Sequence, residues 1–109
     1  MVDPLLQGFD MPLLIEFPIK TKDVPALDAV LVTHADNDHF SIPTNTDLLG
    51  VTKAFHSTVY VDSLMKNMQW PSTGHHIGDV FKVGDISIKL TPADHAYQNA
   101  YPRPGHLHF

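Results

Sequence analysis

The sequence contains no cysteine, so it can form neither disulfide bonds nor thiolate metal sites. It also has no apolar run of about 18 residues or more, and it does not start with a basic segment followed by an apolar one. Basic residues number 7 against 12 acidic ones, and the net charge of −5 disfavours binding to nucleic acid. We therefore expect a soluble, cytoplasmic protein that neither crosses a membrane nor binds nucleic acid.

Histidine is abundant, with 8 residues in a chain of 109. The hydrophobic fraction of 43% is typical of globular proteins, and the length allows one domain with a modest core. Because cysteine is absent, any bound metal must be held by imidazole and carboxylate groups.

The pattern of apolar residues predicts the order strand, helix, strand, helix, hairpin. Residues 27–33 form a continuous apolar run, which is typical of a parallel strand covered on both faces. We expect a short helix that ends at Gly50 and then a strand over residues 51–55. Residues 1–26 are interrupted by prolines and are expected to be extended.

The second half of the chain predicts a helix and a hairpin. A helix to about Met68, with Ser57 as its N-cap, places apolar residues at helical spacing. Residues 75–79 are expected to form a turn. The runs 80–83 and 86–90 alternate between apolar and polar residues around a Gly-Asp turn, a strong hairpin signal.

Four candidate metal ligands follow the 27–33 strand within six residues: His34, Asp36, Asp38 and His39. Side chains at alternate positions of an extended segment point the same way, so the first three could converge, and His39 could join them as the chain turns. In α/β proteins, ligands and catalytic groups usually lie at the carboxyl ends of strands. The alternative is a solvated acidic loop that carries two incidental histidines.

The segments Thr33–His39 and Leu90–His95 together resemble the metallo-β-lactamase superfamily, in particular the branch that includes ascorbate-6-phosphate lactonase. The superfamily signature is Thr-His-x-His-x-Asp-His after a strand, with a further histidine after a later strand. Here Asp36 replaces the middle histidine, and His95 falls where the later histidine is expected. The resemblance covers roughly residues 27–98.

This resemblance implies an α/β fold that is half of an αββα sandwich, with a mixed sheet and helices on one face. Residues 1–109 would form a single partial domain that lacks the C-terminal half. The resemblance also implies two metal ions, one held by His34, Asp36 and His95 and the other by Asp38 and His39. Asp38 would in addition be catalytic, because its second oxygen would orient the attacking water.

The implied activity is hydrolysis of a small phosphorylated, lactone or ester substrate by a metal-bound hydroxide. Zinc is the expected metal. Manganese and iron are alternatives, because the carboxylate of Asp36 is a harder ligand than imidazole.

A second hypothesis is a truncated, non-catalytic half-domain that binds metal or a partner. Five ligands divided between two ions leave one ion with only two protein donors, which is few for tight binding. Half of such a sandwich would also expose an apolar sheet face, so a homodimer is expected to cover it.

The remaining histidines are expected to be structural. His56 is placed at a strand-to-helix junction, as a cap or as a partner of a ligand, and His75 and His76 are placed in the turn before the hairpin. His106 and His108 are assigned to a mobile C-terminal tail.

Overall fold

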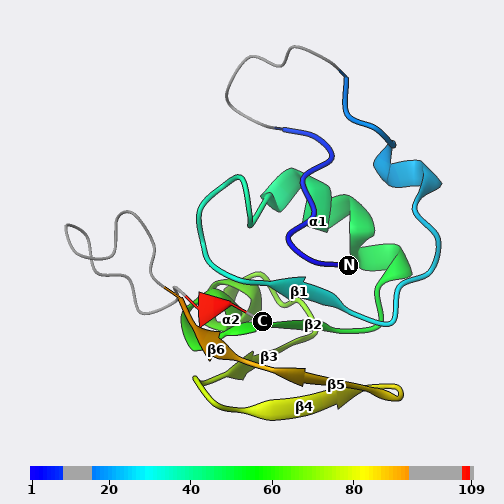
Figure 1. Ribbon diagram of the computed structural model, residues 1–109. Coiled ribbons are helices and arrows are strands. Elements are labelled where there is room, and N and C mark those ends of the chain that lie inside the picture. Colours follow the sequence, from blue (N-terminus) through cyan, green and yellow to red (C-terminus); the bar gives the residue numbers. More distant parts are fainter. Residues whose placement is uncertain (9–15, 94–106, 109) are drawn as a thin grey trace.

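Three short parallel strands form the centre of the fold (Figure 1). The computed structural model describes residues 1–8, 16–93 and 107–108. Within these residues, β1 (Val30–Val32), β2 (Phe55–Thr58) and β3 (Ser72–His75) pair in the order β1-β2-β3. The register places Val30 opposite Phe55 and Phe55 opposite Ser72.

Antiparallel pairs follow the parallel sheet in the sequence. Strands β4 (Val80–Val83) and β5 (Ile86–Lys89) form the hairpin expected from the Gly-Asp turn, and Gly84 there has the positive φ of 56° that such a turn requires. The short strands β6 (Thr91–Pro92) and β7 (Leu107–His108) form a second antiparallel pair. Parallel and antiparallel strands together with helices confirm the expected α/β class.

The helical segments are η1 (Thr21–Asp23), α1 (Ile42–Leu48), η2 (Leu49–Val51) and α2 (Val59–Asn67). Ser41 caps α1 by accepting a hydrogen bond from the backbone N–H of Thr44 at 3.3 Å. The expected cap of α2 is wrong by one residue, because Thr58 caps the helix while Ser57 lies in β2.

The strands differ from expectation in two places. The strand expected over 51–55 starts only at Phe55, because residues 49–51 continue α1 as a 3₁₀ turn. Residues 72–75 form β3, a strand that the sequence pattern does not predict, and His75 lies in it rather than in the expected turn. Their sequence, Ser-Thr-Gly-His, lacks the apolar alternation of a strand, and the segment is held instead by pairing with β2 and packing against α2.

The core lies between the sheet and α2. Its members are fully or almost fully buried apolar side chains from the sheet, from α2 and from the loops beside them, namely Val30, Val32, Phe40, Phe55, Val61, Met65 and Trp70. The Trp70 ring contacts those of Phe55 and Phe40, with centroids 5.6 and 6.2 Å apart. Helix α2 approaches β3 so closely that a Cβ on Gly74 would lie 3.0 Å from that of Asp62. This packing fixes β1, and with it the position at which the loop after β1 begins.

The N-terminal segment runs alongside β1. Val2 forms a parallel bridge with Leu31, and the N–H of Asp3 donates to the carbonyl of Leu31 at 2.8 Å. The first residues thus extend the edge of the sheet and bring Asp3 to the carboxyl end of β1. Within the described ranges, no helix has the length and apolar character needed to cross a membrane.

Phe55 tests this arrangement of the core. Phe55→Ala should lower the free energy of unfolding by about 3–5 kcal/mol, because it removes a ring that has no exposed surface and leaves a cavity beneath Trp70. Urea unfolding followed by tryptophan fluorescence would measure the change. Ile86→Ala is the control, since this side chain is 67% exposed and its loss should change stability by about 0.5 kcal/mol or less. Equal effects of the two substitutions would contradict the assigned core.

Candidate metal centre

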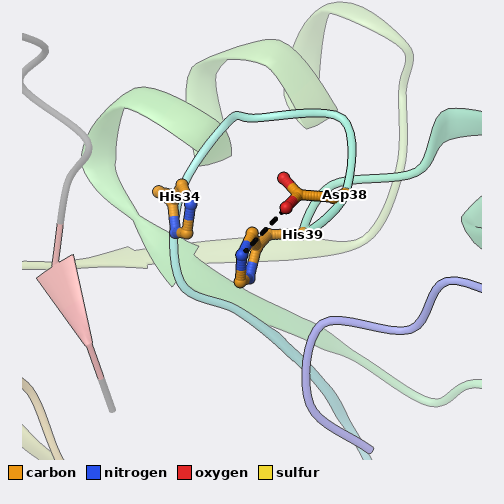
Figure 2. Close-up of side chains that lie close together, drawn as sticks. All are labelled: His34, Asp38 and His39. Carbon is orange, nitrogen blue, oxygen red and sulfur yellow. Dashed lines mark ion pairs between the residues drawn. The ribbon is translucent and has the colours of Figure 1, made fainter. Parts of the chain in front are cut away.

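The loop between β1 and α1 carries the candidate ligands (Figure 2). After the buried pair Thr33 and His34 the chain turns back, and the N–H groups of His39 and Phe40 both donate to the carbonyl of Asp36, at 2.9 and 2.7 Å. Phe40 is anchored in the core. The turn therefore returns the end of the loop to the side of His34.

His34, Asp38 and His39 form a group that could hold a metal ion. Each offers one ligand atom, and the three atoms lie within 4.8 Å of one another. The two imidazole rings have centroids 4.0 Å apart, and the Nε2 atom of His39 is 3.5 Å from an Asp38 carboxylate oxygen. Figure 2 shows the three side chains gathered within the loop. Two imidazole nitrogens and one carboxylate oxygen are a donor set that zinc and other first-row metals accept.

The group is buried at one end and open at the other. The side chain of His34 is 2% exposed, whereas those of His39 and Asp38 are 37% and 50% exposed. A metal ion held here would face solvent on the side of Asp38. An open side of this kind is required for a substrate or a water molecule to reach the ion.

Asp36 lies next to this group without belonging to it. One of its carboxylate oxygens is 3.7 Å from the Nε2 atom of His34, and its side chain is 20% exposed. The structure thus joins His34 to Asp38 and His39, residues that the resemblance divides between two ions. The fifth expected ligand, His95, lies outside the described residues.

Asp3 connects to the loop through three hydrogen bonds. One oxygen accepts from the backbone N–H of Thr33 at 2.7 Å, and the other accepts from the Thr33 hydroxyl at 2.7 Å and from Nδ1 of His39 at 2.9 Å. Because Nδ1 of His39 donates to a carboxylate, Nε2 carries the lone pair in the neutral ring. That atom is the one that faces Asp38.

The same network sets the tautomer of His34. Nδ1 of His34 lies 2.8 Å from the hydroxyl oxygen of Thr33. That hydroxyl donates its hydrogen bond to Asp3, so it can only accept a hydrogen bond from the His34 ring. Nε2 of His34 is then the nitrogen with the lone pair. Asp3 therefore prepares both imidazoles to bind a cation, one directly and one through Thr33.

Asp3 is the residue of this site that the sequence analysis missed. It stands 30 positions before Thr33, and no periodicity links the two. Its φ of 45° is unusual for a residue other than glycine. The hydrogen bonds to Thr33 and His39 hold it in that conformation.

His56, His75 and His76 do not belong to this group. His56 is inside β2, rather than at a strand-to-helix junction, and its ring contacts that of His75 in β3. The side chain of His76 is 79% exposed, near Asp79. Of the two methionines near the end of α2, Met65 is buried in the core and Met68 packs against it.

No protein-family model matches this chain. The resemblance to the metallo-β-lactamase superfamily therefore depends on the Thr33–His39 and Leu90–His95 segments of the sequence and remains a hypothesis.

The role of Asp3 can be tested by metal binding. Asp3→Ala should weaken Zn²⁺ binding by about 10–100-fold, because His39 loses the acceptor that fixes its ring and Thr33 loses two partners. Calorimetric titration of the full chain with Zn²⁺ would measure this. Asp85→Ala removes the same charge from the exposed hairpin turn and should leave the affinity unchanged. Equal affinities for the two variants would contradict the assigned role, and Thr33→Val provides a smaller deletion if Asp3→Ala does not fold.

Proposed function

We propose that the chain is a metal-dependent hydrolase of a small phosphorylated, lactone or ester substrate. The observation that carries the proposal is the group of His34, Asp38 and His39 at the carboxyl end of a parallel strand, with both imidazoles oriented by hydrogen bonds. A metal centre needs such an arrangement, because its ligands must present lone pairs at one point.

Zinc is the metal that this donor set favours. Three protein ligands from imidazole and carboxylate groups, with one side open to solvent, are the pattern of catalytic zinc sites. The carboxylate of Asp36, 3.7 Å from His34, adds a harder oxygen donor beside the group. Manganese and iron are therefore the alternatives.

The residues of the chain would have different roles in hydrolysis. A bound ion would supply a water molecule of lowered pKa and would polarise the carbonyl or phosphoryl oxygen of the substrate. His34 and His39 would hold the ion, and Asp3 would keep their tautomers fixed. One oxygen of Asp38 faces His39, and the half-exposed carboxylate has a second oxygen with which to accept a hydrogen bond from the attacking water.

A cavity lies beside the loop, although none of His34, Asp38 and His39 lines it. It has a volume of about 470 Å³, within the range of small-molecule sites, and its lining includes Ala35 and Asn37 from the ligand-bearing loop. Its other walls are largely apolar and include Phe40, Leu64 and Met68. Such walls suit the non-reacting part of an ester or lactone.

Metal content is the first test of this proposal. The chain purified without added metal should contain at least one equivalent of zinc, manganese or iron by elemental analysis. His34→Ala and Asp38→Ala should lose it, because each removes a member of the group. His95→Ala should also lower it if the later histidine of the motif contributes. His76→Ala, at an exposed histidine away from the group, is the control.

Hydrolysis of nitrophenyl esters, nitrophenyl phosphates and simple lactones should then depend on the metal. A chelator should abolish activity, and Asp38→Ala should lower kcat/KM by about 100-fold or more. A folded protein without metal and without activity on any of these substrates would contradict the proposal.

A second candidate function, an interaction module that pairs with a copy of itself, is favoured by exposed apolar side chains. Val2 and Ile86 are 57% and 67% exposed. A groove of about 390 Å³ runs between residues around Leu31 and the hairpin residues Val83 and Ile88. Apolar surface of this kind marks contact sites between proteins.

Light scattering coupled to size exclusion would test this second candidate. The chain should elute as a dimer at micromolar concentration, and Ile86→Glu should shift it toward monomer, because a carboxylate would be buried in the contact. Val59→Glu places the same charge at an exposed residue on α2 and should leave the dimer intact. A monomer at all concentrations would exclude pairing.

A further inference from the structure

A second pair of histidines lies away from the metal centre. Nδ1 of His56 in β2 and Nε2 of His75 in β3 are 3.0 Å apart. The register pairs His56 with Thr73 and Thr58 with His75, so the two histidines are diagonal neighbours on one face of the sheet. Phe55 occupies the opposite face, which α2 covers. The pair therefore lies on the side of the sheet away from α2.

The geometry of the pair is that of a hydrogen bond rather than a chelate. The ring centroids are 5.2 Å apart, and the two nitrogens are 3.0 Å apart. The centroid distance exceeds the nitrogen distance by about two ring radii, so the two nitrogens lie close to the line that joins the centroids. One ring N–H then points at the lone pair of the other ring. Two lone pairs that bind one cation would instead converge at an angle.

Phe81 of β4 covers this pair. Its ring is stacked on His75 with a centroid distance of 3.9 Å and an interplanar angle of 10°, and on His56 at 4.5 Å and 20°. The β4–β5 hairpin, the yellow and orange arrows at the bottom of Figure 1, forms no ladder with the parallel sheet among the described residues. The stack of three rings is thus a direct contact through which the hairpin is held to the sheet.

We propose that His56, His75 and Phe81 form an acid-sensitive latch, which holds the β4–β5 hairpin on the sheet while the imidazoles share a hydrogen bond and releases it when both are protonated. Two neutral imidazoles provide one donor and one acceptor at this contact. Two imidazolium ions provide donors alone, and their charges repel at 3.0 Å. Double protonation therefore removes the hydrogen bond and separates the rings over which Phe81 lies.

The surroundings oppose protonation of the pair. Burial, and then the charge of His75, lower the pKa of His56 from 6.5. Burial also lowers the pKa of His75, against the opposite effects of Asp79 and Asp62 and with a further lowering by His76. Since the closed latch binds protons less tightly than the open chain, its stability is complete above about pH 6.5 and is lost as the pH drops from there to the lowered pKa values.

The charged groups around the pair come from two elements. Helix α2 contributes Asp62, which is paired with Lys66 at 2.9 Å, and the turn before β4 contributes His76 and Asp79. Strand β1 contributes no charge, because Leu31 is the register partner of His56. The hairpin lysines alternate with Phe81 and its cross-strand partner and therefore project from the other face of the hairpin. The two nearby carboxylates favour a first, shared proton, so release requires the second.

Hydrogen exchange of the full chain would test the latch. A two-stranded hairpin alone is marginally stable in water, so amides of residues 80–89 should lose protection once it is released. After correction for intrinsic exchange rates, their protection should fall by about tenfold or more between about pH 7.5 and pH 4.5, a greater loss than in β1 and β2. Unchanged relative protection would overturn the proposal.

Matched variants identify the groups responsible. Asparagine places an amide where Nδ1 of histidine lies, and glutamine reaches the place of Nε2, so His56→Asn combined with His75→Gln keeps a neutral hydrogen bond that cannot titrate. This double variant should retain protection at acid pH, whereas His76→Gln should behave like the wild type. Acid release that persists in the double variant, or disappears in His76→Gln, would overturn the proposal.

If the double variant does not fold, ring-proton NMR of the wild type decides. The midpoint of release must coincide with the titration of His56 and His75, and coincidence with another histidine instead would overturn the latch.

Discussion

The candidate metal centre depends on the hydrogen bonds that the carboxylate of Asp3 accepts. The carboxylate accepts hydrogen bonds from the backbone N–H and the hydroxyl of Thr33 and from Nδ1 of His39. One side chain therefore fixes the start and the end of the ligand-bearing loop. A loop without this connection would leave two imidazoles free to rotate and to exchange tautomers. Because the N-terminal segment also bridges to β1 at Leu31, the position of Asp3 follows from the sheet itself. The geometry of the centre is thus a consequence of backbone pairing.

The rest of the fold supports this edge of the sheet. Parallel pairing places the carboxyl ends of β1, β2 and β3 on one side, and α2 covers the face that carries Phe55. Phe40 then ties the end of the loop to the same core, one residue after His39. The ligand-bearing loop is therefore anchored at both ends by buried groups, while Asp38 remains half exposed. A site that must bind a cation and admit a substrate needs this combination of fixed ligands and open access.

Sequence patterns predicted the structural features that depend on residues close together in the chain. The apolar run before Thr33 and the Gly-Asp turn each reflect neighbouring residues, and the described structure confirms the parallel strand and the hairpin. It brings His34, Asp38 and His39 together and leaves Asp36 beside them, which is a different grouping from either of those expected. Features that depend on distant partners were missed. Strand β3 is polar and is held by β2 and α2, and Asp3 reaches its partners across 30 positions.

The two histidine pairs show how one residue type acquires two chemistries. His34 and His39 direct Nδ1 to oxygen acceptors, which leaves Nε2 of each ring as the nitrogen that can bind a cation. His56 and His75 direct nitrogens at each other instead, and Phe81 covers the contact, so their lone pair is used internally. The first pair could thus serve a cation, whereas the second pair uses its lone pair within the protein and, in the proposed latch, responds to protons instead.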